Sequence, residues 1–95
     1  MQKVGVMKRH RSEEFAPLIL VMSGQKENRP VKSLRDMAKA LILAWPSDDG
    51  EEYMIAVKTC LDALYGDVSV KDARAALIRA AEEAGILVIG SFTEN

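Results

Sequence analysis

The sequence predicts a single α+β domain in which a small β-hairpin packs against three α-helices, in the order ββααα(β), where a C-terminal strand can extend the hairpin to three strands. Three observations lead to this fold class. A length of 95 residues accommodates one domain. Two short runs of branched apolar residues lie near the ends of the chain. Three segments between them repeat their apolar residues at helical spacing. We expect the domain to span residues 15–90, with a basic N-terminal tail over residues 1–14 and a C-terminal tail over residues 91–95.

The strands are predicted from short apolar runs. Residues 18–22 form a continuous apolar run that suits a strand better than a helix. A polar loop with one glycine follows, and residues 29–32 are expected to return as the second strand of a hairpin. Pro30 must then lie at the start of this strand or on a sheet edge, because it has no N–H group to donate. Residues 86–89 have the composition of a buried strand and are the candidate third strand.

The first helix is predicted to begin at Ser33 and to end at Trp45. Ser33 and Asp36 have the spacing of a capping box, and Pro46 ends the helix because the residue before a proline disfavours helical geometry. The apolar residues recur at i, i+3, i+4, i+7 and i+11, which places them on one face: Leu34, Met37, Ala38, Leu41 and Trp45.

The second helix is predicted over residues 51–65. Asp48 or Asp49 is expected to cap its N-terminus, and Gly66 follows at the position where a left-handed glycine often ends a helix. Its buried stripe is predicted to consist of Tyr53, Ala56, Val57, Cys60, Leu61 and Leu64.

The third helix is predicted to begin at Ser69 and to end at Gly85. Its apolar face consists of Ala73, Ala76, Leu77, Ala80, Ala81 and Ala84. Five of these six residues are alanine, so this face lets another helix or a sheet approach closely. Leu77 is its one large side chain.

Composition excludes several classes of protein. An apolar content of 48% and a charged content of 28% are typical of a globular domain, and a net charge of −1 gives no overall attraction to nucleic acid or membrane. No apolar run approaches the roughly 20 residues that cross a membrane, so no membrane partner is expected. The single cysteine, Cys60, cannot form an intramolecular disulfide, which favours a reducing, cytoplasmic location. Its apolar neighbours at helical spacing predict that it is buried.

The residue inventory also limits the chemistry. One cysteine and one histidine, His10, cannot build the usual zinc sites or a nucleophile–histidine triad within one chain. The glycines do not have the spacing of a dinucleotide fingerprint or a phosphate loop. We therefore expect no catalytic residue, no metal site and no cofactor. A small enzyme that uses Asp48, Asp49 or Glu52 is the least favoured alternative, because turn and cap chemistry explains these carboxylates.

The first helix carries more apolar residues than one face requires. Ile42 and Leu43 lie off its main apolar face, and three helices with a small sheet leave little to cover them. We therefore predict a non-enzymatic interaction or regulatory domain that forms a homodimer and buries Ile42 or Leu43. An unidentified protein partner could cover the same residues.

The near-neutral net charge hides an uneven distribution. Residues 1–35 hold eight basic and three acidic residues, a balance of +5, whereas residues 36–95 hold five basic and eleven acidic ones, a balance of −6. A cluster in and after the hairpin supplies the candidate anion-binding residues Lys26, Arg29, Lys32 and Arg35. Aromatic residues that stack on bases are missing from this segment, so nucleic acid is the less favoured partner. A solvated surface, or a contact between the two charged halves within one chain or across a dimer, is favoured instead.

An ordered set of residues over about three-quarters of the chain resembles a family of short bacterial proteins known as domain of unknown function 982. The set comprises Arg29, Val31, Ser33, Trp45, Pro46, Gly50, Tyr53, Ala56, Cys60, Ala63, Leu64, Gly66, Ala73, Arg74, Ala76, Ala80, Ala81, Ala84, Gly85 and Ile86. The chain departs from the family at Leu77, where a phenylalanine often stands, and at its basic N-terminal extension. The resemblance implies a small soluble bacterial protein with a hairpin followed by helices, and it implies no reaction, ligand or partner. Arg74 is expected to form an ion pair with Asp62 or Asp67, or to bind an anion.

Overall fold

The computed structural model describes residues 15–22 and 28–90, so the predicted tails and Lys26 lie outside the described residues. The elements in chain order are β1 (Leu18–Val21), β2 (Asn28–Val31), α2 (Leu34–Lys39), the π-helix η1 (Ala40–Ala44), α3 (Glu51–Leu64), α4 (Val70–Ala84) and β3 (Leu87–Gly90). This order confirms the predicted α+β class and its ββαααβ arrangement. The first predicted helix is a short α-helix that continues as η1.

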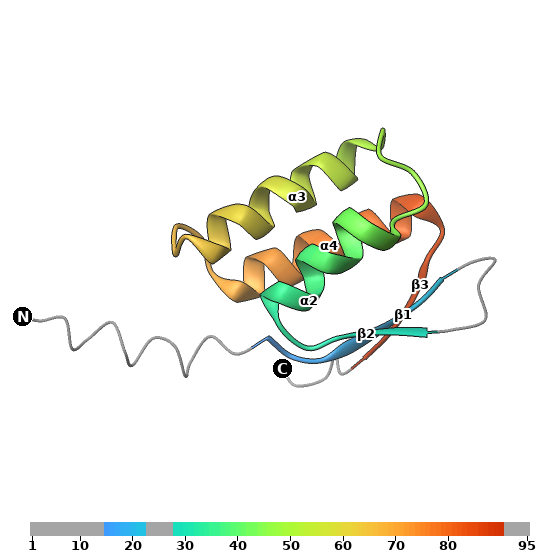
Figure 1. Ribbon diagram of the computed structural model, residues 1–95, viewed down its shortest axis with the longest axis horizontal. Coiled ribbons are helices and arrows are strands. Elements are labelled where there is room, and N and C mark those ends of the chain that lie inside the picture. The colour runs from blue at the N-terminus through green and yellow to red at the C-terminus, as the bar shows by residue number, and fades with distance from the viewer. Residues whose placement is uncertain (1–14, 23–27, 91–95) are drawn as a thin grey trace, which may run out of the picture.

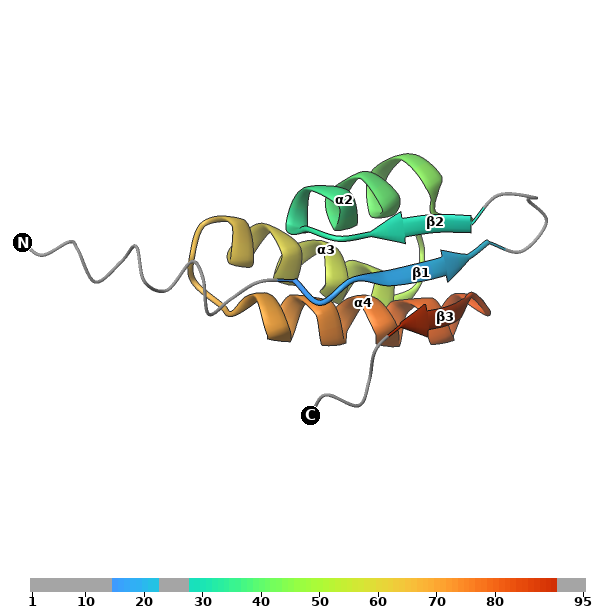
Figure 2. The same cartoon turned by 90° about the horizontal axis from the view of Figure 1, so that it is seen from below.

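The elements form three layers. Figure 1 shows the sheet at the bottom, α2 and α4 above it, and α3 on top of these two helices. The contacts agree, because α3 packs mainly on α4 and also on α2, while α2 contacts β2 and α4 contacts β3. Figure 2, which views the molecule from below, shows the strands nearest the viewer with the helices behind them. One face of the sheet is therefore covered by helices, and no described element covers the other face.

The sheet has the strand order β2-β1-β3, and both pairs of neighbours are antiparallel. Ile19 of the central strand lies opposite Pro30 on one side and Ile89 on the other. Leu18, Leu20 and Val31 point into the core. Because side chains alternate along a strand, Ile19, Pro30 and Ile89 point to the uncovered face. The prediction that Pro30 lies on a sheet edge is confirmed.

The third strand differs from its prediction as a buried strand. Leu87 is 62% exposed and Ile89 is 50% exposed, whereas only Ile86, just before the strand, is fully buried. A sheet with helices on one face buries only alternate residues of each strand, so a continuous apolar run leaves half of its side chains outside. The result is an edge strand that is apolar on both faces.

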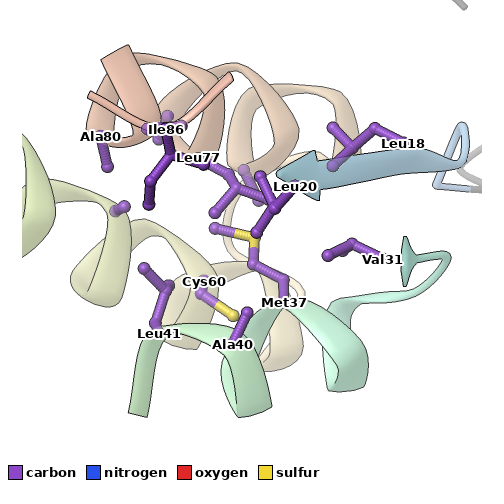
Figure 3. Packing of buried hydrophobic residues seen from close by; sticks show 14 of the residues in the cluster. Leu18, Leu20, Val31, Met37, Ala40, Leu41, Cys60, Leu77, Ala80 and Ile86 are labelled. Carbon is purple, nitrogen blue, oxygen red and sulfur yellow. The ribbon is translucent and has the colours of Figure 1, made fainter. Parts of the chain in front are cut away.

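Helix α4 confirms its predicted features. Ser69 caps its N-terminus by accepting a hydrogen bond from the backbone N–H of Asp72, and Gly85 ends it in the left-handed conformation at φ 76°. The alanines at positions 73, 76, 80 and 81 are almost fully buried, and so is Leu77. Figure 3 shows Leu77 pointing toward Leu20 in the centre of the core. α4 is thus the central helix, with α3 on one side and the sheet on the other.

The predicted buried stripe of α3 is partly wrong. Its buried residues are Ala56, Cys60 and Ala63, whereas Leu61 is 48% exposed and Leu64 is 50% exposed. Alanines on the α4 side allow the two helix axes to approach closely, so the small residues face inward. The larger apolar side chains of α3 are left on its outer side.

The N-terminus of α3 is capped by a residue distant in sequence, which corrects the prediction that Asp48 or Asp49 caps it. The N-cap position is Gly50, which makes no side-chain cap. Instead, the Glu83 carboxylate of α4 accepts hydrogen bonds from the backbone N–H groups of Glu52 and Tyr53 at 3.1–3.2 Å. A Cβ atom on residue 50 would overlap this carboxylate, so any larger residue there would displace the Glu83 side chain from its capping position.

The π-helical turn η1 was not predicted, and Tyr53 completes its hydrogen bonding. In a π-helix each carbonyl pairs with the N–H group five residues later, and the residue five after Leu41 is Pro46, which has no N–H group. The hydroxyl of Tyr53 donates to the Leu41 carbonyl at 2.9 Å and supplies the missing donor. The Trp45 and Tyr53 rings also contact each other, with centroids 6.2 Å apart.

We therefore expect Tyr53→Phe to lower the free energy of unfolding by about 1–3 kcal/mol, because it leaves the partly buried Leu41 carbonyl without a donor. Urea denaturation followed by circular dichroism measures the change. Tyr65→Phe is the matched control, because the Tyr65 side chain is exposed and its change should be within about 0.5 kcal/mol. Equal stability of Tyr53→Phe and the wild type would show that this hydrogen bond does not support the turn.

Candidate interaction surfaces

The outer side of α3 carries a row of uncovered apolar side chains, which we call the α3 ridge: Met54, Val57, Leu61, Leu64 and Tyr65. All except the partly buried Val57 are exposed. Figure 1 shows α3 as the outermost layer, with no element above it. Met54, Val57, Leu61 and Leu64 follow one another at intervals of three, four and three residues, and Tyr65 lies four residues after Leu61, so all five lie on one side of the helix. Exposed apolar side chains in such a contiguous row are typical of an interaction surface.

The two predicted dimer contacts, Ile42 and Leu43, are 67% and 75% exposed. Ile42 lines a shallow hollow of about 490 Å³ together with Trp45 and Tyr53, close to the start of α3. Leu43 does not line this hollow, because successive residues of a helix point in different directions. The structure therefore places Ile42 beside Trp45 and Tyr53 and directs Leu43 elsewhere.

The predicted basic cluster is only partly brought together. A hollow of about 500 Å³ between β2 and α2, which we call the basic hollow, is lined by Met22, Asn28, Arg29, Pro30, Lys32, Asp36 and Lys39. Arg29 and Lys32 were predicted site residues, whereas Lys39 was missed because it lies on the second turn of α2, beyond the hairpin segment. Arg35 does not line the hollow. Among the described residues, none of these four cations has an ion pair.

Asp36 is the one carboxylate among the described residues that line the basic hollow, and it is engaged by backbone groups. Its carboxylate accepts a hydrogen bond from the Lys32 N–H at 3.0 Å, and its own N–H donates to the Ser33 hydroxyl at 3.1 Å. These two bonds complete the N-terminal cap of α2, so the predicted capping role of Ser33 is confirmed. With three cations and one carboxylate, the described side chains that line the hollow carry a net positive charge.

Asp48, Asp49 and Glu52, the carboxylates of the alternative enzyme hypothesis, have different neighbours. The Ser47 hydroxyl donates to Asp49, and Glu52 lies 3.6 Å from the Arg79 guanidinium. Asp48 is exposed at the rim of the hollow beside Trp45. In residues 15–22 and 28–90, no group of three His, Cys, Asp or Glu side chains is arranged to hold a metal ion.

Cys60 is buried between α3 and α2, as predicted. Its thiol lies 3.7 Å from the Leu34 carbonyl, and burial raises the pKa of the thiol above its ordinary value. A raised pKa reduces the thiolate fraction at neutral pH, which lowers the nucleophilicity of the side chain. Cys60 thus acts as a small core residue.

The sequence predicts that Arg74 pairs with an acid or an anion. In the structure its guanidinium binds the segment that leads into β1. Its Nε atom donates to the Ala16 carbonyl at 2.7 Å. This bond joins α4 to the residues just before the central strand, so Arg74 has a structural role that its position in an alanine-rich helix did not reveal.

By its fold and its surfaces, the protein is a small α+β domain whose described residues form exposed apolar and basic surfaces. None of the helices in the described part of the chain has the length and apolar character of a membrane-spanning segment. Over residues 16–88 the chain matches the family model described as "Protein of unknown function (DUF982)", and it belongs to that family. The matched region begins after the basic N-terminal extension, which the sequence had also set apart. No curated protein and no solved structure matches the chain significantly.

Proposed function

We propose that the protein is a small non-enzymatic interaction domain that self-associates by packing the α3 ridge against the α3 ridge of a second copy, with Ile42 at the margin of the contact. The observation that carries this proposal is the row of exposed apolar side chains on α3. Each such side chain that a partner buries would contribute about 1.5–3 kcal/mol to the free energy of association. The contact is expected to be two-fold symmetric, as in most homodimers.

The spacing of the ridge supports a helix as its counterpart. Met54, Val57, Leu61 and Leu64 follow at intervals of three, four and three residues, which is the spacing of the a and d positions of a heptad repeat. Side chains at this spacing interlock with the same pattern on a facing helix. A second copy of α3 offers that pattern.

The charges beside the ridge support an antiparallel arrangement. Glu51 and Lys58 lie seven residues apart and therefore flank the ridge on the same side. In an antiparallel pair the same flank of each helix faces the other copy, so Glu51 of each chain can approach Lys58 of the other. The exposed pair between Lys58 and Asp62, at 2.8 Å, can exchange for this contact at little cost.

A non-enzymatic role is supported by the separation of Asp48, Asp49 and Glu52, which have different neighbours. A cytoplasmic setting suits a chain whose single cysteine is buried as a thiol. In this proposal the domain acts through the surface that the pair of copies presents, so its activity is binding.

We expect Leu61→Lys or Met54→Lys to weaken self-association by roughly 30-fold or more, because each substitution removes about 2 kcal/mol of apolar burial and places a charge in the contact. Multi-angle light scattering after size-exclusion chromatography, over a range of loading concentrations, measures the mass of each variant.

Ile55→Lys is the matched control. Ile55 is similarly exposed on the same helix, but it points roughly 100° away from Met54 and lies off the ridge. It should keep the mass of the wild type. A wild type with the mass of one chain at every concentration, or equal losses for Leu61→Lys and Ile55→Lys, would contradict the proposed contact.

A second candidate function is the binding of an anionic partner, with single-stranded nucleic acid as the test case. The observation that favours it is the convergence of Arg29, Lys32 and Lys39 on one hollow, without ion pairs in the described part of the chain. Cations held close together repel one another, and a phosphate group in the hollow would relieve that repulsion. None of the described residues that line the basic hollow is aromatic, so they offer no side chain on which bases would stack.

For this candidate we expect Arg29→Glu or Lys39→Glu to lower affinity for a fluorescein-labelled single-stranded DNA by at least about tenfold at low salt. Arg35→Glu makes the same charge change on α2 outside the hollow, and its affinity should fall by less than about threefold. Fluorescence anisotropy at several salt concentrations measures both. Equal effects of Arg29→Glu and Arg35→Glu would indicate general electrostatic attraction, and the basic hollow would then be rejected as a site.

A further inference from the structure

We propose that β3 is a second self-association edge, at which another copy of the chain adds its own β3 in antiparallel orientation. The two three-stranded sheets would then join into one sheet of six strands. This contact lies outside the α3 ridge and does not depend on it.

The two edges of the sheet are protected very differently. At the β2 edge, Pro30 has no N–H group to pair with another strand, and Arg29 and Lys32 place positive charge beside it. Proline and charged side chains are the usual devices by which proteins prevent a sheet edge from pairing. β3, with the sequence Leu-Val-Ile-Gly, contains no proline and no charged residue. No other described strand pairs with the outer edge of β3, and no residue of the strand opposes pairing there.

No described element covers the outer face of β3 either. Leu87 and Ile89 are half or more exposed, and Ile89 lines a shallow hollow of about 280 Å³ with Ile19 and Pro30. In an antiparallel pair centred on Val88, Leu87 of each copy lies opposite Ile89 of the other. Such cross-strand apolar pairs stabilise a sheet. Val88 would continue to face the core of its own copy, so the pairing requires no rearrangement of the core.

The charges at the two sheet edges favour a second copy of the chain as the partner, and they favour the pairing of β3 with β3. Pairing β2 with β2 would bring Arg29 and Lys32 of both copies together. Pairing β2 with β3 would place Pro30 in the hydrogen-bonded ladder, and it would leave one β2 edge and one β3 edge of the pair open to further copies. Pairing β3 with β3 joins two uncharged strands. Because two identical strands pair antiparallel about a two-fold axis, this contact closes after two copies.

The β3 edge and the α3 ridge can be occupied at the same time. Figure 1 shows α3 and the sheet on opposite sides of the layer formed by α2 and α4. A chain that uses both contacts forms an assembly larger than a dimer. Removing one contact should then leave a dimer held by the other.

Four proteins test this inference by light scattering: the wild type, Leu87→Lys, Leu61→Lys and the double variant. A lysine on the outer face of an edge strand is tolerated by the fold, because Leu87 is exposed, but it opposes pairing. We expect an assembly above a dimer for the wild type, a dimer for each single variant and one chain for the double variant. Asn28→Lys, which adds the same charge at the β2 edge, should keep the wild-type mass.

The outcomes separate the two contacts. If Leu87→Lys and Asn28→Lys both have the mass of the wild type, the β3 pairing is overturned. The α3 ridge then stands if that mass is a dimer and Leu61→Lys reduces it to one chain. If Leu61→Lys keeps the wild-type mass and Leu87→Lys is reduced to one chain, the β3 pairing stands and the ridge fails.

A second measurement does not depend on whether the Leu87→Lys variant folds. In Leu61→Lys, backbone amides of β3 should exchange with deuterium at least about tenfold more slowly at high than at low protein concentration, because pairing buries them. Exchange of these amides at the same rate across a hundredfold range of concentration would overturn the inference.

Discussion

The structure depends on the close approach that the alanines of α4 allow on two sides of one helix. Ala73, Ala76, Ala80 and Ala81 of α4 are almost fully buried, and Ala56 and Ala63 are buried on α3, which packs mainly on α4. Small side chains bring backbones together, which gives a dense core from few large residues. Leu77 then fills the space toward the sheet, where Leu20 lies (Figure 3). A larger residue on either side of α4 would push a whole layer away, because protein cores do not deform freely.

This packing also determines what is left outside. Because α3 turns its alanines inward, its leucines and methionine form the α3 ridge. Because the helices cover one face of the sheet, Leu87 and Ile89 remain exposed on the other face. The exposed apolar side chains are thus a direct consequence of the layer order. Both proposed contacts use apolar side chains that this layer order leaves outside the core.

Local signals predicted most of the fold. The caps at Ser33 and Ser69, the helix end at Gly85 and the edge position of Pro30 each depend on a residue and its near neighbours in sequence. The buried side of α3 could not be predicted in the same way, because the helix has apolar residues around much of its circumference and Leu61 and Leu64 outweighed Ala63. Which stripe is buried depends on the helix that packs against it. The cap from Glu83, the donor from Tyr53 and the place of Lys39 in the basic hollow are likewise contacts between elements, which one segment of sequence does not reveal.

The central claim is that the folded protein is an assembly of copies. Its most direct test is the dependence of stability on protein concentration, since association stabilises the folded state by mass action. The urea midpoint of the wild type should rise steadily over a hundredfold increase in concentration, by the equivalent of about 2–3 kcal/mol if two copies unfold as one unit. A midpoint that stays the same over that range would contradict the account, because it would mean that the exposed apolar surfaces remain in water.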